Sequence, residues 1–228
     1  MSAESGDRAR VLSRIADHLV GLEGTHPIRV AIDGLSGAGK STLADELASI
    51  VESRGRSVIR ASIDDFHRPR ADRYQMGRLS PEGYYRFAFD YPAFRASLLL
   101  PLGPGGDRRY RLAIFDQRHD TPVETPECEA SPDAILLVDG VFLLRPELDD
   151  LWDFRIFVDA DVNVAIERAI RRDMTVATSL ERVRETYRRR YVPGERIYLE
   201  TVRPMAKADL ILGNTDVEHP CPRGVRST

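Results

Sequence analysis

Five stretches of the chain have the length and the apolar or β-branched content of strands. They lie at residues 30–32, 57–63, 134–138, 154–158 and 208–212. Residues 7–22, which precede the first of these stretches, repeat apolar positions at helical spacing, and helix-forming residues fill positions 43–48 after it. Because strands that alternate with helices form a parallel sheet covered on both faces, the pattern predicts an α/β fold with a doubly wound parallel sheet. Ligands of such sheets bind beyond the carboxyl ends of the strands.

The segments between the later strands are less regular. We expect a helix at 92–102, a strand at 110–115, and loops at 103–107 and 121–132. Residues 67–92 are polar, aromatic and rich in turn formers, with too little apolar periodicity for a framework element. This composition indicates a substrate-binding insertion over the sheet edge.

Residues 165–190 combine helical spacing with many arginines and are interrupted near 175–179 by β-branched and small residues. The arginines in this stretch are Arg168, Arg171, Arg172, Arg182, Arg184, Arg188, Arg189 and Arg190. Since they cannot all face one ligand, most should form a solvated face, while one or two close over a phosphoryl group. We therefore expect an arginine-rich lid at 168–190, and a polar tail at 213–228.

Length and composition limit the alternatives. A chain of 228 residues with 42% hydrophobic content fits a single domain spanning residues 1–228. The formal charge of −3 provides no basic excess for a nucleic-acid partner. Cys128 and Cys221 are far apart, and neither a signal-like amino terminus nor an apolar run of membrane-spanning length is present. These features favour a cytoplasmic protein without a membrane partner.

The strongest motif follows the first predicted strand. Gly34, four intervening residues, then Gly39, Lys40 and Ser41 match the phosphate-binding spacing G-x-x-x-x-G-K-[ST]. The motif stands between a strand and a helix, as its function requires, and Lys40 is one of only two lysines in the chain. A P-loop NTPase fold is therefore expected. The predicted cofactor-binding residues are Gly34, Ser36, Gly37, Ala38, Gly39, Lys40, Ser41 and Thr42.

The residue types of this loop fit a triphosphate. Glycines let the backbone turn with its N–H groups inward, and those donors join the positive end of the following helix in an anion cradle. Lys40 would bridge the terminal phosphates, and the Ser41 hydroxyl would bind Mg²⁺. The cofactors expected from the sequence are therefore ATP and Mg²⁺.

Carboxylates follow two of the predicted strands. Asp139 ends an apolar run, at the place where a metal-binding acid of an NTPase is expected, although an Asp-Gly turn has the same pattern. Asp64 and Asp65 follow another strand, and one of them would accept the proton of a substrate hydroxyl. An Asx turn or a helix cap is the alternative. His67 and His119 have no histidine or cysteine partner at metal-binding spacing.

With these motifs assembled, residues 28–214 resemble the uridine kinase and phosphoribulokinase family of P-loop kinases. The loop GLSGAGKST is shared by many kinases, but the order of further segments is more specific. SIDDFHRP resembles the family's D-x-F motif, FDYPAF its F-D-x-P segment, and LLVDGVFLL its acidic strand end. The resemblance implies ATP-dependent transfer of the γ-phosphate to a primary hydroxyl, with Mg²⁺.

The resemblance also implies roles for individual residues. Asp64 matches the general base and a metal-linked position, Asp139 the metal-linked acid, and Asp90 the acid that holds the ribose hydroxyls in uridine kinases. Lys40, Arg168 and Arg172 match catalytic cations, the two arginines leading into the lid. Base recognition would fall to Phe115, Arg118 and His119.

Two segments depart from the family pattern. After Asp173 the chain reads MTVATSLE where the family usually carries an Arg-Gly pair, and IFDQRHD only loosely resembles the base-recognition strand of uridine kinases. The leading hypothesis is thus a kinase of a uridine-like or cytidine-like nucleoside. Pantothenate, a sugar phosphate or a specialised metabolite are alternative acceptors. A nucleotide-binding regulatory module that has lost phosphoryl transfer is the alternative outside enzymology, and a homo-oligomer is compatible with all of these.

Overall fold

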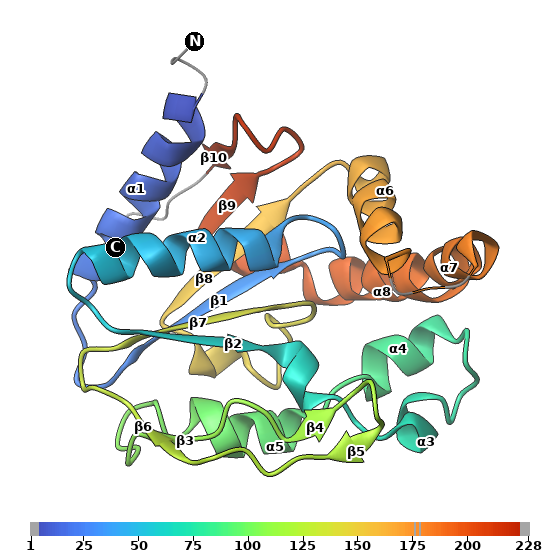
Figure 1. Cartoon of the computed structure of the whole chain (residues 1–228), viewed down its shortest axis with the longest axis horizontal. Helices are drawn as coiled ribbons and strands as arrows, with labels where there is room; N and C mark the ends of the chain where they lie inside the picture. Colours follow the sequence, from blue (N-terminus) through green and yellow to red (C-terminus); the bar gives the residue numbers. More distant parts are fainter. Residues whose placement is uncertain (1–4, 176, 178, 224–228) are drawn as a thin grey trace.

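The structure is a computed structural model that describes residues 5–175, 177 and 179–223. A six-stranded sheet with the order β10-β9-β8-β1-β7-β2 forms its centre (Figure 1). The strands are β1 (Ile28–Gly34), β2 (Val58–Ser62), β7 (Ile135–Gly140), β8 (Phe154–Asp159), β9 (Leu210–Gly213) and β10 (Cys221–Arg223). All neighbouring pairs are parallel except β9 with β10. The predicted α/β fold with a mostly parallel sheet is confirmed, and β1 is an interior strand.

Both faces of the sheet are covered by apolar clusters, because side chains alternate along the interior strands. Val30 and Ile32 of β1 pack with α1 (Ser5–Gly21) and α2 (Lys40–Ser53). These two helices lie on one side of the sheet (Figure 1). Ala31, between them in sequence, belongs to the cluster on the opposite face. That second cluster includes residues of α5 (Tyr91–Phe94), the π-helical segment η2 (Arg95–Leu99) and α8 (Val192–Val202).

The arginine-dense region is helical, as expected. It comprises α6 (Val162–Asp173), α7 (Leu180–Thr186) and the π-helical segment η4 (Tyr187–Tyr191), and α8 follows directly. The predicted interruption falls between α6 and α7, with positions 176 and 178 of that prediction outside the described residues. The short helix α9 (Pro204–Lys207) follows α8, and the 3₁₀ turn η3 (Asp149–Leu151) precedes β8.

The segment 67–92 contains more regular structure than its composition indicates. It follows the 3₁₀ turn η1 (Ile63–Phe66) and includes α3 (Arg70–Arg73) and α4 (Pro81–Phe87). Ser80 caps α4 by accepting a hydrogen bond from Gly83 N, and Pro81 occupies the first turn. These local start signals, rather than an apolar stripe, account for a helix that periodicity does not reveal.

The predicted strand at 110–115 is wrong. Its ends belong to two different two-stranded sheets, β3 (Arg109–Tyr110) with β6 (Cys128–Glu129), and β4 (Phe115–Asp116) with β5 (Thr121–Pro122). Between them, Arg111 N donates to Ser97 O and Ile114 N donates to Asp65 O. The backbone bonds to several different segments in turn, so alternation of apolar residues does not produce a ladder here.

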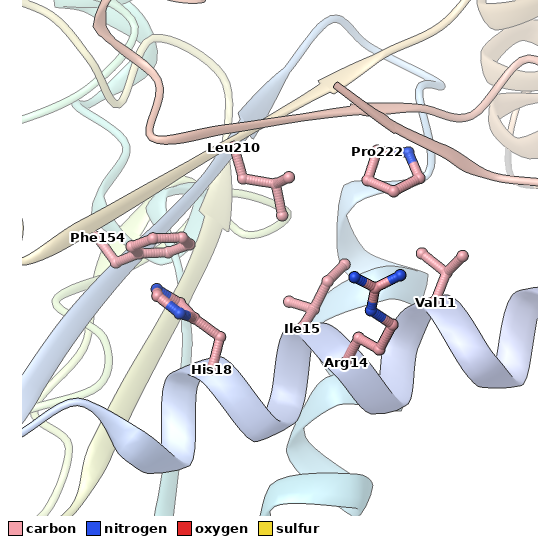
Figure 2. A pocket seen from close by; sticks show the side chains of 7 residues that line it. All are labelled: Val11, Arg14, Ile15, His18, Phe154, Leu210 and Pro222. Carbon is pink, nitrogen blue, oxygen red and sulfur yellow. The ribbon is translucent and has the colours of Figure 1, made fainter. Parts of the chain in front are cut away.

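The polar tail also forms structure that was not expected, because β10 extends the sheet. An apolar cavity of about 550 Å³ lies beside this edge and is lined by residues of α1, β8, β9 and β10 (Figure 2). In it the His18 and Phe154 rings pack 4.8 Å apart. None of the helices within residues 5–175, 177 and 179–223 combines the length and apolar character needed to cross a bilayer.

Candidate active site

The phosphate-binding loop joins β1 to α2 at the carboxyl edge of the sheet, as predicted. Gly37 has a φ of 78°, and a Cβ atom there would lie 2.0 Å from Ala165 O of α6. Only glycine fits both the backbone conformation and this close approach. Gly39 also has a positive φ and immediately precedes α2, so the first amides of that helix open toward the loop. The backbone therefore provides the anion cradle that the motif requires.

Lys40 is almost fully buried at the start of α2. Its Nζ donates to Leu35 O at 2.8 Å, so the side chain curls back over the loop. Burial lowers the pKa of Lys40, and the nearby carboxylates act in the opposite direction, Glu195 most strongly, followed by Asp33. The ammonium group thus lies under the cradle and within a ring of acids.

Ser41 and Asp139 meet across the edge of the sheet. Ser41 Oγ donates to Asp139 Oδ2 at 2.6 Å, and Arg60 Nη2 is 3.0 Å from Asp139 Oδ1. A hydroxyl and a carboxylate side by side are the hard oxygen donors that suit Mg²⁺, which completes its shell with phosphate oxygens and water. Within the described residues no cluster of three histidine, cysteine or acidic side chains could hold a metal alone. The residues present therefore fit a magnesium ion that arrives with a nucleotide.

Asp64 is placed by the turn that follows β2. Ser62, the last residue of that strand, lies opposite Asp139 in the sheet register, and its Oγ accepts from Asp64 N at 3.3 Å. Gly140 permits this arrangement, because a Cβ there would lie 2.2 Å from Ile63 Cγ2. The exposed Asp64 carboxylate consequently stands at the same edge as Asp139. Burial raises the pKa of the adjacent Asp65, and Asp64 and Asp139 raise it further.

Two cavities meet at the loop, and we name them the nucleotide-side and the acceptor-side cavity after the ligands expected from the sequence. The nucleotide-side cavity, about 570 Å³, is lined by Arg8, Gly37, Gly39, Lys40, Ser41, Thr42, Glu46, Arg168, Ala169, Arg172, Asn214, Val217 and Glu218. The acceptor-side cavity, about 280 Å³, is lined by Ser36, Lys40, Ser41, Asp64, His67, Tyr84, Phe89, Gln117, Asp139, Gly140, Val141, Arg172, Asp173, Tyr187 and Tyr191. Lys40, Ser41 and Arg172 line both. A group passing from one cavity to the other would therefore pass these three side chains.

Arg168 and Arg172, the two arginines expected to lead into a lid, occupy different positions. Arg172 lies at the junction of the cavities, where Nε is 2.9 Å from Asp173 Oδ1 and Nη2 is 3.4 Å from Tyr187 Oη. Arg168 lines the nucleotide-side cavity alone, and it donates to the backbone oxygens of Asn214 and Thr215 at 3.0 and 2.7 Å. Of these two arginines, only Arg172 lines the cavity that contains Asp64, and it shares both cavities with Lys40.

The four residues expected to recognise a nucleoside are not among those lining the acceptor-side cavity. Asp90 caps α5 by accepting from Ala93 N at 3.0 Å, although its own amide donates to Phe66 O beside Asp64. Phe115 is buried, with 5% of its surface exposed. Arg118 and His119 are exposed and bond to Asp116. Their proposed roles require a rearrangement of these contacts.

Gln117, which sequence reasoning missed, reaches the cavity from the same hairpin. Its Nε2 is 3.3 Å from His67 Nε2, and His67 Nδ1 is 2.7 Å from Asp64 O. Burial lowers the pKa of His67, which favours the neutral ring, and in that form Nδ1 carries the proton, because the Asp64 carbonyl only accepts. Nε2 then accepts from the Gln117 amide. No spacing in the sequence signals this pair, because its members are 50 residues apart.

Two side chains of helix α8, which the sequence did not indicate as site residues, contact the loop and the end of β1. Glu195 accepts hydrogen bonds from Ser36 N at 3.0 Å and Ser36 Oγ at 2.5 Å. One turn further on, Tyr198 Oη donates to Asp33 Oδ2, and Gly34 N donates to Asp33 Oδ1 at 2.7 Å. Burial raises the pKa of Asp33 to about 6, against the effect of these hydrogen bonds.

The loop, the strand-end acid and the two joined cavities define this molecule as a P-loop kinase. A model of the phosphoribulokinase / uridine kinase family matches residues 29–218, and the chain belongs to that family. It is 30% identical over 180 residues to a uridine kinase of Alkaliphilus metalliredigens, covering 78% of each chain. A uridine kinase of Leuconostoc citreum is 30% identical over 190 residues, covering 80% of each.

Solved structures agree on the fold. A structure described as that of a possible uridine kinase from Bacillus stearothermophilus superposes with a TM-score of 0.69, at 24% identity, over 89% of this chain and 98% of that one. D-glycerate 3-kinase from Cryptococcus neoformans superposes with a TM-score of 0.56, at 16% identity, over 82% and 86% of the two chains. The same architecture therefore occurs in proteins named for different acceptors.

Proposed function

We propose that this protein transfers the γ-phosphate of ATP to a hydroxyl group of a small polar acceptor in the cytoplasm, with Mg²⁺. The observation that carries the proposal is the set of three residues, Lys40, Ser41 and Arg172, common to the two cavities. ATP fits the side formed by the glycine loop, and the acceptor fits the side that contains Asp64. Lys40 and Arg172 stabilise charge on the phosphoryl group as it passes between them.

Asp64 acts as the general base in this proposal. Its carboxylate is exposed to the cavity that would hold the acceptor, so it can orient the attacking hydroxyl and accept its proton. Ser41 and Asp139 hold Mg²⁺, which supplies charge neutralisation at the phosphate oxygens when bound. Arg168 contacts the nucleotide rather than the acceptor, because it faces the first cavity only.

The acceptor proposed first is a nucleoside resembling uridine or cytidine, as the names of the relatives suggest. Asp90 would then hold a vicinal diol, with Phe115, Arg118 and His119 near the base. The small acceptor-side cavity and its lining by Gln117 and His67 favour, as a second candidate, a compact polyol or hydroxy acid with no base. Both candidates would accept the phosphoryl group in the same way. They differ only in the part of the acceptor that is recognised by residues away from Asp64.

ADP formation from ATP and Mg²⁺ with a panel of nucleosides, sugars and hydroxy acids tests the proposal. We expect ADP release to depend on one acceptor class, and Asp64→Asn to lower kcat by about 10²- to 10⁴-fold without weakening ATP binding. Asp72→Asn, an exposed acid in α3, is the matched control and should retain activity. Slow ADP release that no acceptor increases would instead support a regulatory nucleotide-binding module.

A further inference from the structure

Glu195 is a buried carboxylate that the proposed phosphoryl transfer does not use. It lies on α8 with 5% of its surface exposed, and one of its oxygens accepts both hydrogen bonds from Ser36. Burial raises its pKa, while these bonds and the charges of Lys40 and Arg172 act in the opposite direction. Burying an ionised carboxylate costs free energy unless hydrogen bonds or opposite charges compensate for the lost hydration.

The donor that Glu195 engages belongs to the phosphate cradle. Ser36 is a loop residue that lines only the acceptor-side cavity, whereas Lys40 and Arg172 line both cavities. Its amide therefore lies at the end of the loop where the last phosphate of a triphosphate would be. In this structure a carboxylate oxygen of the protein occupies the position of an anion at that amide.

The negative charge of Glu195 should act mainly on the γ-phosphate. Among the acids around Lys40, Glu195 has the strongest electrostatic influence on the ammonium group. A γ-phosphate would meet the same amide and the same cation, beside a negative charge in a poorly hydrated place. The β-phosphate of a diphosphate, which is bound one phosphate further back, would stop short of this position.

On the basis of the proposed function, we propose that Glu195 discriminates between ATP and ADP. Its carboxylate competes with the γ-phosphate for the Ser36 amide and for Lys40, and so lowers the affinity for ATP without affecting ADP to the same extent. Tyr198, three residues further along α8, holds Asp33 beneath the loop. The same helix face thus supports the cradle at one point and regulates its occupancy at the other.

Binding of ADP and of the non-hydrolysable analogue AMP-PNP, both with Mg²⁺ and without acceptor, tests this inference by calorimetry. Glu195→Gln keeps an oxygen for the Ser36 amide but removes the charge. We expect its Kd for AMP-PNP to fall by about tenfold, and its Kd for ADP to change less than about twofold, the size of one screened charge contact. Equal changes for both nucleotides, or no change, would overturn the role of Glu195.

Glu200→Gln is the matched control, because it removes an exposed acid from the same helix and Glu200 lines neither cavity. It should leave the Kd of both nucleotides unchanged. If Glu195→Gln does not fold, Ser36→Ala removes one of the two anchors of Glu195 and should favour AMP-PNP by about threefold, a smaller shift in the same direction. Absence of that shift would equally refute the inference. Failure of the wild-type protein to bind either nucleotide would instead contradict the proposed function.

Discussion

The nucleotide-side and acceptor-side cavities are built in different ways. The first has one continuous segment at its centre, the loop and α2, with α6 closing over Gly37 and with α1 and residues 214–218 completing the lining. The second collects side chains from η1, α4, the β4–β5 hairpin, β7, α6 and η4. A contiguous motif determines its own geometry through backbone conformation, whereas a wall assembled from many segments depends on how those segments pack. We therefore expect substitutions to have larger and more uniform effects on the nucleotide side.

The largest effect should come from the side chain at the junction of the two cavities. Arg172→Ala should lower kcat by about 10³-fold, since a cation that stabilises the transferring phosphoryl group acts mainly in the transition state. Steady-state kinetics with saturating ATP would measure it. Arg171 is its exposed neighbour on α6 and does not line either cavity, so Arg171→Ala should retain nearly full turnover. Similar losses in the two variants would show that the helix, and not the position of Arg172, is responsible.

The buried support of the loop should be visible in the pH dependence of stability. The pKa of Asp33 rises from its usual 3.8 to about 6 in the folded protein. Between these values the unfolded chain ionises while the folded chain keeps its proton, so the free energy of unfolding falls by about 3 kcal/mol in total as pH rises from below 3.8 to above 6, with about 2 kcal/mol of this between pH 4 and 6.

Asp33→Asn lacks this contribution. The difference in unfolding free energy between wild type and variant should therefore shift against the wild type across that pH range. Denaturant titrations at pH 4, 5, 6 and 7 measure the difference, in which the other titrating groups cancel. Parallel stability curves for the two proteins would contradict a raised pKa at Asp33.

The proposed metal position beside Ser41 and Asp139 should show an intermediate effect. Asp139→Asn should raise the Mg²⁺ concentration required for half-maximal activity by about 10- to 100-fold, because a charged oxygen donor is lost. Arg60 pairs with both Asp139 and Asp45, so Asp45→Asn disturbs the same arginine without touching the proposed metal position. A magnesium requirement that changes equally in both variants would assign the effect to Arg60 instead.

The smallest effect is expected on the acceptor side, and it compares two residues of one hairpin. Gln117→Ala should raise the acceptor KM by about fivefold, as for the loss of one hydrogen bond, whereas His119→Ala should change it little. Kinetics at saturating ATP distinguish them. The reverse result would favour the recognition role inferred for His119 from the family resemblance, and would require the hairpin to turn when the acceptor binds.

The residues that the sequence placed at the edge of the sheet have one of two features. They belong to a contiguous motif, or they stand at the end of a strand. The glycine loop, Asp139 at the end of β7 and Asp64 after β2 all lie at the predicted edge of the sheet. Parallel strands bring such ends together wherever the intervening chain runs. The strand expected at 110–115 failed because its amides bond to Ser97 and Asp65, partners that no local pattern reveals.

The sequence by itself determined the alternation of strands and helices, the phosphate-binding loop and the acids that follow the strands. These depend on backbone preferences and on spacing within short segments. Only the tertiary structure decided that Gln117 rather than His119 reaches the acceptor-side cavity, and that Glu195 meets Ser36 from 159 positions away. Contacts of this kind arise when separately formed elements pack, and the geometry of that packing is a property of the whole chain.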